Sequence, residues 1–592
     1  MEDEINIEFN EDNDFGFFYG YSFSDSETES ESEEEAEVSF AQELAVWATE
    51  CQLKREGINQ ILKILRKQGH TLPKDARTLL QTPKTVEADN LCGGQYKYYG
   101  IEVGILKTLD QYPDFVQNFN SVDLLVNVDG VPIFKSSGAQ FWPILCKFGK
   151  YSPFLVALYY GLHKPNSVDE FMRDFLTELA NLQEHGLVYE SHNLNITLRG
   201  FICDAPARAF LKCTKSHTGY YSCERCTIKG YYKHNRVVLY ASNDHPSRNN
   251  VDFCSMGYND HQMKDSPLIH YDINCIEGFC LDYMHLVCLG VVKRILVYLK
   301  QGPKECKLSA AQISSISDAL VQLNGKFPSE FARQPRSLYE LERWKATEFR
   351  QFLLYSGPVV LKKVLSKESY EHFLALTVAV SILLDADDEK RNSYLEYAKQ
   401  LLHFFVHCSK RIFTEIFLSY NVHNLLHLAD DVSNFMCSLN EISAFPFENH
   451  LQSIKRMVRN AKSPLVQVTK RLHELEKFGT KLKSSNTNNG IAFISTRAKD
   501  RCFLLQNNDY AFVLEKLANG KLMCKVVRQA DAKEFFLKPC SSKLINIAYM
   551  ETRTKFKRKI LDKRDFIRKV ACLPYTNGSV LFPLLHGVER RN

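Results

Sequence analysis

Two apolar runs that each stop at an aspartate constrain the fold of this 592-residue chain more than any other feature. One run, residues 124–128, is followed by Asp129, and the other, residues 201–203 at the end of a strand predicted at 194–203, is followed by Asp204. Runs this apolar indicate strands that are buried in a sheet. A carboxylate at the end of a buried strand is costly unless a partner compensates its charge. The pattern therefore predicts an α/β domain with acids placed at the ends of its strands.

Further elements of this domain are predicted around the two strands. Apolar segments at 141–148 and 154–160 indicate two more strands. The motif Ser167-Val-Asp-Glu170 is typical of a helix start, and Gly186 is typical of the end of that helix. A short helix is expected at 205–212. The predicted order is therefore strand, strand, strand, helix, strand, helix.

The remaining segments are distinguished by their composition. Residues 1–38 are predicted to be a disordered acidic tail, because Ser and Glu dominate them and leave too little apolar surface for a core. Residues 39–115 are predicted to be helical, and two short helices around Gly57 would form either a plain helical hairpin or a DNA-binding helix-turn-helix. Residues 214–440 are predicted to be mostly helical.

The C-terminal part begins with a short apolar strand expected at 442–445, followed by a helix that runs from Phe447 to about Asn460. Residues 488–592 are predicted to form a small β-rich domain, in which Asn519-Gly520 is typical of a hairpin turn. The segment 553–569 is dense in Lys and Arg. Both DNA contact and dimerisation are open as roles for this domain.

Charge separates the first forty residues from the rest. Residues 1–40 hold fifteen Asp and Glu and no Lys or Arg, so the remainder has 74 basic against 55 acidic side chains, a net charge of +19. That excess indicates a polyanionic partner or a basic solvated surface. No run reaches about 18 apolar residues and no secretory pattern is present, so an intracellular protein without membrane contact is expected. There, 18 cysteines favour metal binding over disulfides.

A third acid, Glu448, is predicted to open the helix near Phe447. Together with Asp129 and Asp204 it forms the kind of carboxylate set that binds two Mg²⁺ or Mn²⁺ ions about 3.5–4 Å apart for phosphoryl transfer. A single acid is usually a solvated surface residue, so the prediction depends on the setting of all three. Glu441 is a nearby rival, but it precedes the apolar segment and does not open the helix.

Basic residues follow Glu448 along the predicted helix. Lys455 and Arg459 lie seven and eleven positions later, so they are expected on the face of Glu448, and Arg456 and Lys462 would broaden the stripe. Such a stripe is suited to DNA phosphates. The alternative is a solvent-exposed face laced with salt bridges, although few acids are nearby.

Two further constellations contain metal-ligand residues. Cys223-Glu-Arg-Cys226 has the spacing of a zinc knuckle, and His423 and His427 would share one face of a helix, so together they could hold a structural zinc ion. The alternative is buried cysteines and core histidines. Asp282 and His285 also share a helical face, where they would serve either as accessories to the metal centre or DNA contact, or as a capped helix start with a core histidine.

These motifs resemble the catalytic domain of CACTA (En/Spm-like) DNA transposases over residues 40–480, particularly animal transposase-domain proteins. The resemblance lies in six stretches that occur in order: Leu-Leu-Val-Asn-Val-Asp129-Gly-Val-Pro, Lys-Ser-Ser-Gly-Ala-Gln-Phe-Trp-Pro-Ile, Phe-Ile-Cys-Asp204-Ala-Pro-Ala-Arg-Ala, His-Thr-Gly-Tyr-Tyr-Ser-Cys223-Glu-Arg-Cys226, Leu-Asp282-Tyr-Met-His285-Leu-Val-Cys-Leu-Gly and Phe-Glu448-Asn-His.

The resemblance implies an RNase H-like mixed-sheet core made of residues 116–213 and 441–485, with the α-helical segment 214–440 inserted between the second and third acids. It assigns the family's acids to Asp129, Asp204 and Glu448. The chain is also similar to the wider group that includes the V(D)J recombinase core, where a Cys-x-x-Cys pair and a later histidine pair bind zinc. That similarity supports the four zinc ligands proposed above.

The expected function is a nuclear DDE-type transposase, active or domesticated, that hydrolyses a phosphodiester at a transposon end and joins the freed 3′-hydroxyl to target DNA. Double-stranded DNA and a second copy of the chain, as a homodimer or higher oligomer, are the expected partners. Rival hypotheses are a catalytically inactive DNA-binding or regulatory protein on the same fold, a zinc-stabilised interaction protein and a plain nuclease. A distinct N-terminal domain for recognising transposon ends is not evident.

Overall fold

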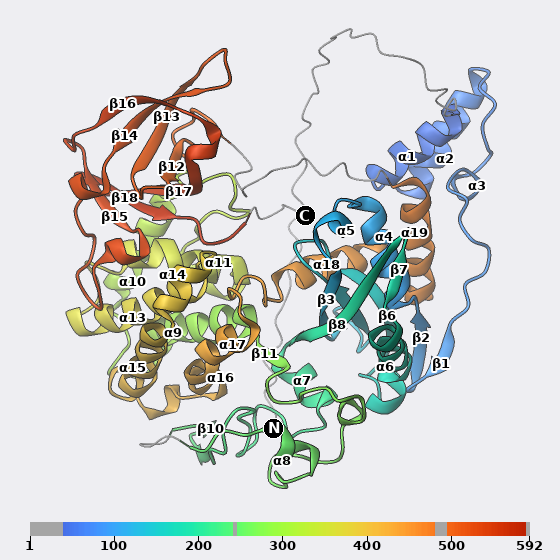
Figure 1. Cartoon of the computed structure of the whole chain (residues 1–592), viewed down its shortest axis with the longest axis horizontal. Coiled ribbons are helices and arrows are strands. Elements are labelled where there is room, and N and C mark those ends of the chain that lie inside the picture. The colour runs from blue at the N-terminus through green and yellow to red at the C-terminus, as the bar shows by residue number, and fades with distance from the viewer. Residues whose placement is uncertain (1–38, 241–244, 480–493, 588–592) are drawn as a thin grey trace.

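The computed structural model describes residues 39–240, 245–479 and 494–587 (Figure 1). The predicted acidic tail at 1–38 lies outside these residues. The chain is a mixed α/β protein with a nine-stranded sheet, a large helical unit and a C-terminal seven-stranded β half-barrel. In Figure 1 the nine-stranded sheet and the helical unit lie side by side, and the C-terminal strands lie against the helical unit. Within the described ranges, every helix is too short or too polar to cross a bilayer.

Five neighbouring strands of the nine-stranded sheet, the last of them at its edge, are β6 (Phe154–Gly161), β5 (Gln140–Lys147), β3 (Ser121–Val128), β8 (His192–Cys203) and β11 (Phe279–Leu281), in that order. Strand β3 is antiparallel to β5 but parallel to β8, which is in turn parallel to β11. Each of these three parallel strands is followed directly by an aspartate: Asp129, Asp204 and Asp282. Parallel strands end at one edge of a sheet, so the topology gathers three acids there.

The sheet contains strands that the sequence patterns did not indicate. Strands β1 (Asp89–Leu91) and β2 (Gly94–Tyr98) extend it beyond β6, although 39–115 was predicted to be helical. Strand β11 lies in the segment predicted to be mostly helical. These predictions were wrong because β1 and β11 have three residues each and β2 is polar, so none shows a recognisable period.

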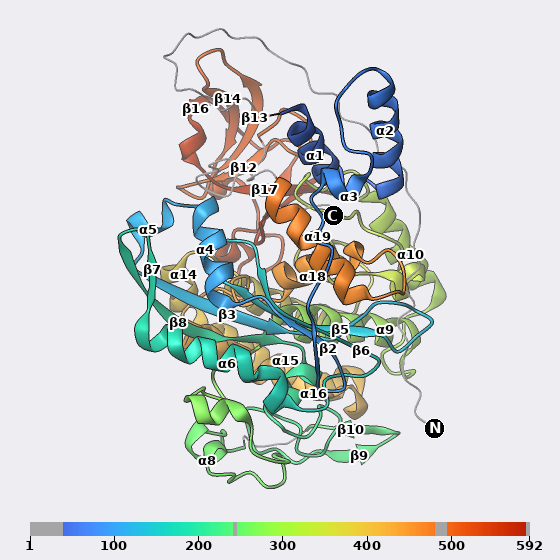
Figure 2. The same cartoon turned by 90° about the vertical axis from the view of Figure 1, so that its right-hand side faces the viewer.

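Helices cover both faces of the sheet (Figure 2). Alternate residues of β3, including Val122 and Leu124, pack in one core with α4 (Ile101–Gln111) and α6 (Val168–His185). Leu125 points the other way and joins the core that includes α18 (Phe445–Met457) and α19 (Pro464–Phe478). Residues 442–445 do not form the predicted strand, because Phe445 already begins α18.

The caps of α6 follow the prediction. The Ser167 side chain accepts a hydrogen bond from the Glu170 amide at 3.2 Å, and Gly186 ends the helix with a φ of 72°. A positive φ suits glycine, which lacks a Cβ. The helix after β8, α7 (Ala205–Leu211), also has the expected position.

The N-terminal helices α1 (Phe40–Glu50), α2 (Arg55–Lys67) and α3 (Ala76–Leu79) form a small core with Phe478 at the end of α19. Gly57, expected between two helices, lies in the first turn of α2. The break falls instead at residues 51–54, where Gln52 has a φ of 51°. The sequence pattern therefore placed the break between the two helices about four residues too late.

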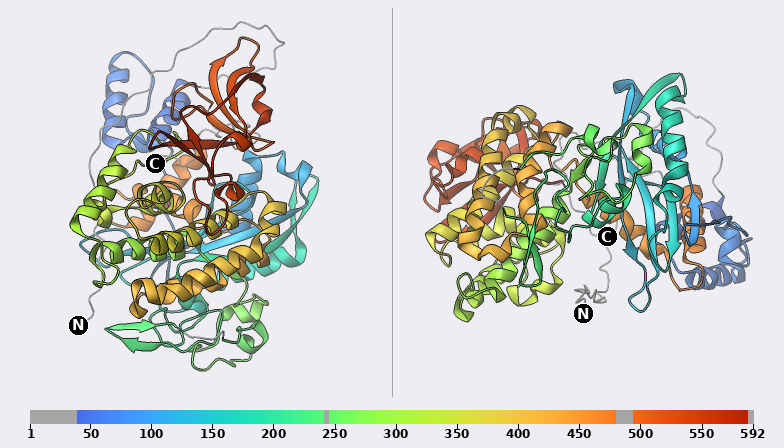
Figure 3. Two further views of the ribbon diagram at one scale, coloured as in Figure 1. Left: turned by 90° about the vertical axis from the view of Figure 1, so that its left-hand side faces the viewer. Right: turned by 90° about the horizontal axis from the view of Figure 1, so that it is seen from below.

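The helical unit begins at the π-helix Met284–Val292. Residues 213–240 and 245–283 are mostly loops, with short strands β9 (Tyr231–Lys233) and β10 (Arg236–Val238) and the short helix α8 (Asn250–Cys254). Seen from below in Figure 3, this loop segment lies between the sheet and the helical unit. The α-helices of the helical unit are α9 (Lys293–Gln301), α10 (Ala310–Gln322), α11 (Ala346–Gln351), α12 (Gly357–Val360), α13 (Lys367–Leu383), α14 (Asp388–Ser393), α15 (Leu395–Phe413), α16 (Tyr420–Asn424) and α17 (Leu428–Phe435).

The C-terminal half-barrel has the strand order β15-β18-β17-β12-β13-β14-β16. Gly520, with a φ of 77°, makes the predicted hairpin turn between β13 and β14. Lys569 is buried and pairs with Glu330 of the helical unit at 2.8 Å and with Asp500 at 3.0 Å. The strands are β12 (Cys502–Leu505), β13 (Tyr510–Lys516), β14 (Leu522–Val527), β15 (Ala548–Glu551), β16 (Lys557–Leu561), β17 (Phe566–Tyr575) and β18 (Gly578–Pro583).

Candidate functional site

Asp129, His285 and Glu448 come together at the sheet edge, each with a ligand atom within 4.8 Å of those of the other two. Asp129 follows β3, His285 lies in the first turn of the π-helix, and Glu448 lies in the first turn of α18. The His285 Nε2 lies 3.8 Å from Glu448 Oε1. We call these three residues the acid cluster.

The acid cluster has the electrostatics of a cation site. Burial raises the pKa of Asp129 well above its usual range, and the negative charges of Asp204 and Glu448 raise it further. A divalent cation would relieve the repulsion among these carboxylates, so the oxygen donors present are suited to Mg²⁺ or Mn²⁺.

Asp204 directly follows β8, as predicted, but it does not join the acid cluster. Its carboxylate caps α7 by accepting a hydrogen bond from the Ala207 amide at 2.8 Å, and it is not among the residues within 4.8 Å of one another. The negative charge of Asp204 still raises the pKa of both Asp129 and His285. The rival acid Glu441 is exposed and folds back to accept hydrogen bonds from Ser438.

Asp282 holds two parts of the acid cluster in place, namely His285 and the start of α18. It is buried and accepts hydrogen bonds from the amides of Met284 at 3.2 Å and His285 at 2.9 Å, from His285 Nδ1 at 2.7 Å and from the Ala444 amide at 2.7 Å. The last bond fixes the residue that caps α18, four residues before Glu448. Both sequence hypotheses for this pair therefore describe part of what Asp282 does.

Asp282 also sets the charge of His285. Burial alone would lower the pKa of His285, but the hydrogen bond that His285 donates to Asp282 and the charges of Asp282, Asp129 and Asp204 raise it to about 10. Burial alone would raise the pKa of Asp282, but the hydrogen bond from His285 and the charge of His285 lower it below its usual range. At neutral pH an imidazolium therefore faces the carboxylates.

The predicted phosphate-binding stripe is only partly on α18. That helix ends at Met457, because Val458 has an extended backbone with a ψ of 117°, so Arg459 and Lys462 lie in the loop that follows. Arg459 donates a hydrogen bond from Nη2 to the Leu53 carbonyl at 3.1 Å and so holds the N-terminal helices. The prediction that Arg459 shares a helix face with Glu448 was wrong. Lys455 and Arg456 lie on α18, and Arg456 and Lys462 are exposed.

The four residues predicted to bind zinc meet in one place, with Cys223, Cys226, His423 and His427 within 4.8 Å of one another. Cys223 Sγ lies 3.6 Å from His427 Nε2 and 3.5 Å from Cys226 Sγ, and Cys226 Sγ lies 3.3 Å from His423 Nε2. A tetrahedral zinc ion with bonds of about 2.3 Å to sulfur and 2.0–2.1 Å to nitrogen requires separations of about 3.6–3.8 Å. We call these residues the zinc cluster.

The zinc cluster has the surroundings of a metal thiolate site. The amides of Arg225 and Cys226 both donate to Cys223 Sγ at 3.4 Å. His423 lies in the last turn of α16, and His427 is the last residue of the 3₁₀ turn that follows. The two histidines therefore lie on two consecutive helical segments of different pitch. With four protein ligands and little exposure, this cluster suits a structural ion with no open position for chemistry.

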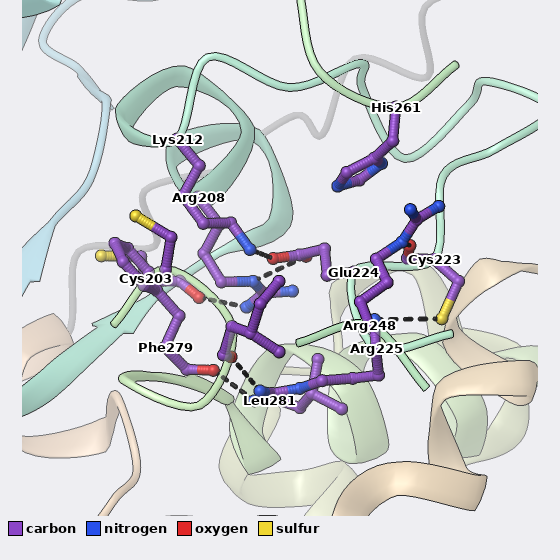
Figure 4. Close-up of polar contacts among 12 residues, drawn as sticks. Cys203, Arg208, Lys212, Cys223, Glu224, Arg225, Arg248, His261, Phe279 and Leu281 are labelled. Atoms are coloured by element: carbon purple, nitrogen blue, oxygen red, sulfur yellow. Dashed lines mark hydrogen bonds and ion pairs between the residues drawn. The ribbon is translucent and has the colours of Figure 1, made fainter. Parts of the chain in front are cut away.

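Sequence reasoning missed the buried charged residues beside the zinc cluster. These are Asp431 and four residues that Figure 4 shows, namely Arg208, Lys212, Glu224 and Arg225. Charged residues in a loop normally indicate solvent exposure, so composition points away from them. The only available signal was the placement of Glu224 and Arg225 between the two cysteines.

Comparison with known families gives one match: a family described as a domain of unknown function (DUF8592) matches residues 472–584. The match covers the end of α19 and most of the C-terminal half-barrel, and both metal-ligand clusters lie outside it. No curated protein matches the chain.

Proposed function

We propose that this protein is a DDE-type DNA transposase that uses divalent cations for phosphodiester hydrolysis and strand transfer. The observation that carries the proposal is the meeting of Asp129 and Glu448, which lie 319 positions apart in the chain, with ligand atoms within 4.8 Å of each other. Asp129 is buried, and the negative charges of Asp204 and Glu448 raise its pKa further, so the three acids repel one another at a place where a divalent cation would compensate their charge.

The topology supports the same proposal. The strand order β6-β5-β3-β8-β11, with β3 antiparallel to β5 and parallel to β8, supports the proposal of an RNase H-like core. In that fold the first two acids follow the first and fourth strands, which here are β3 and β8. The third acid then comes from a helix packed on the sheet, as Glu448 does in α18.

In this proposal Asp129, Asp204 and Glu448 would hold two Mg²⁺ or Mn²⁺ ions, which lower the pKa of a bound water and stabilise charge on the leaving oxygen. Lys455, Arg456 and Lys462 would contact phosphates of double-stranded DNA, while Arg459 holds the N-terminal helices. Cys223, Cys226, His423 and His427 would hold a structural zinc ion. Action on DNA in the nucleus as a homodimer or larger assembly is part of the proposal.

Nicking of supercoiled plasmid by the full chain, in Mg²⁺ and in Mn²⁺, tests the proposal without knowledge of the transposon ends. Losing several kcal/mol of cation-mediated stabilisation corresponds to a rate decrease of about 10³-fold, so Asp129→Asn should lose nicking by about that factor and keep DNA binding. Undiminished nicking by this variant would contradict the proposal. Joining of a labelled oligonucleotide to the plasmid separates a transposase from a plain nuclease.

One observation favours a second candidate, a catalytically inactive DNA-binding or regulatory protein derived from a transposase. The carboxylate of Asp204 caps α7 and stands outside the acid cluster. Retained DNA binding with no nicking in either cation would support this second candidate.

A further inference from the structure

The zinc loop contains two charged residues that zinc binding does not require. Glu224 and Arg225 lie between the ligands Cys223 and Cys226, and only 6% and 7% of their surfaces are exposed. A buried charge is costly unless specific partners compensate it. Figure 4 shows Glu224 and Arg225 reaching away from Cys223 toward the ends of the core strands.

Glu224 bonds to the helix that Asp204 begins. Its carboxylate accepts a hydrogen bond from Arg208 Nε at 2.9 Å and one from Lys212 Nζ, and both partners lie on the segment that starts with α7. Arg208 links Glu224 to the sheet, because its Nη1 donates a hydrogen bond to the Cys203 carbonyl at 2.6 Å. Cys203 is the last residue of β8 and directly precedes Asp204.

Arg225 bonds to the strand that Asp282 follows. Its guanidinium donates to the Ile276 and Phe279 carbonyls and pairs with Asp431 Oδ1 at 2.6 Å. The other oxygen of Asp431 accepts the Leu281 amide at 2.6 Å. Leu281 ends β11 and directly precedes Asp282, which holds both His285 and the start of α18.

We infer that the zinc cluster and the acid cluster are coupled through these two arms, with Glu224 and Arg225 as positioning residues for the carboxylates. Zinc fixes the backbone of residues 223–226, and that backbone fixes the two side chains that hold the strand ends. By linkage, zinc then raises the affinity of the acid cluster for a divalent cation, and the cation raises the affinity for zinc by the same factor. The part of this inference that concerns catalysis depends on the proposed function, whereas the mechanical link does not.

The first measurement is the Mn²⁺ dissociation constant of the full-length, zinc-loaded chain, by electron paramagnetic resonance. Glu224→Gln and Asp431→Asn should keep one zinc per chain and weaken Mn²⁺ binding by about tenfold, a typical strength for coupled sites. Arg248→Lys is the matched control. Arg248 is a buried arginine whose Nε donates to the Cys223 carbonyl at 3.1 Å, so it touches the same loop but neither strand end. Its Mn²⁺ affinity should equal that of the wild type.

The second measurement is hydrogen exchange of the peptide that covers residues 279–285, with a peptide from β13 as internal reference. Both arm variants, and removal of zinc from the wild type, should speed exchange at 279–285 by about tenfold or more while β13 stays unchanged. Wild-type affinity and exchange in zinc-loaded arm variants would overturn the coupling. A wild type that binds no Mn²⁺ but shows faster exchange at 279–285 without zinc would refute the proposed function and support the coupling.

Discussion

Replacing Asp129 with asparagine should make the protein more stable when no divalent cation is bound. Burial raises the pKa of Asp129, and the charges of Asp204 and Glu448 raise it further. Between the usual pKa of about 3.9 and this raised value, the folded chain holds a proton that the unfolded chain has lost. Stability of the wild type therefore falls, by up to about 1.4 kcal/mol per pH unit, as the pH rises through that window. The asparagine side chain of the variant does not titrate, so the variant does not lose stability in this way.

A divalent cation should reverse the ranking. Binding to the folded state alone, at a concentration 100 times the Kd, stabilises the wild type by about 2.7 kcal/mol. For a cooperative unit of roughly 200 residues, each kcal/mol changes the Tm by about 2–4 °C, so Mn²⁺ should raise the wild-type Tm by about 5–11 °C. Asp129→Asn lacks a ligand and should gain much less.

Scanning calorimetry of the zinc-loaded chain at pH 6, 7 and 8, with and without MnCl₂, measures both effects. Asp123→Asn serves as a control, because Asp123 is an exposed aspartate on the same strand. The reasoning fails if the wild type is the more stable protein in cation-free buffer at every pH. It also fails if Mn²⁺ raises the Tm of the wild type and Asp129→Asn equally.

Three further predictions concern charges elsewhere in the chain. Lys569→Met leaves Glu330 and Asp500 buried without their cation, so the free energy of unfolding in urea should fall by about 3–5 kcal/mol at pH 7. Lys569 helps hold the pKa of Asp500 below its usual value even though burial opposes this, so the difference should shrink as the pH falls below about 4. Exchanging the exposed Lys557 and Lys559 of β16 for Glu should weaken DNA binding and reduce the slope of log K against log salt by about 2, with unchanged binding arguing for dimerisation instead. Arg459→Ala should loosen the N-terminal helices by about 0.5–1.5 kcal/mol, seen as faster proteolysis near Leu53, without the loss of DNA affinity expected for Lys462→Ala.

Long, uniformly patterned elements were predictable from the sequence. Strands β3 and β8 are long apolar runs, and α6 has a serine cap and a glycine end, so local chemistry alone determines them. Strand β11 was missed, because three residues show no period and its place depends on pairing with β8. The same reason explains β1, which exists through its hydrogen bonds to β2.

The two clusters were predictable to different degrees. The four residues of the zinc cluster could be paired in advance, because thiolates and imidazoles at these spacings are typical metal ligands. The capping role of Asp204 and the loop position of Arg459 depend on where helices begin and end, which sequence patterns locate poorly. The bonds of Glu224 and Arg225 depend wholly on tertiary packing, so no local pattern indicates them.

The order of the ligands along the chain has a consequence for the newly synthesised protein. His427 is the last zinc ligand, and Glu448 follows 21 positions later. On a ribosome that adds about 5–20 residues per second, the zinc cluster is therefore complete about 1–4 s before the last acid is made. The loop that holds the strand ends can close before the third carboxylate exists. Under the proposed function, a fragment released in that interval would contain the zinc cluster but not the full set of carboxylates, so interrupted translation would not expose the genome to a partly built nuclease.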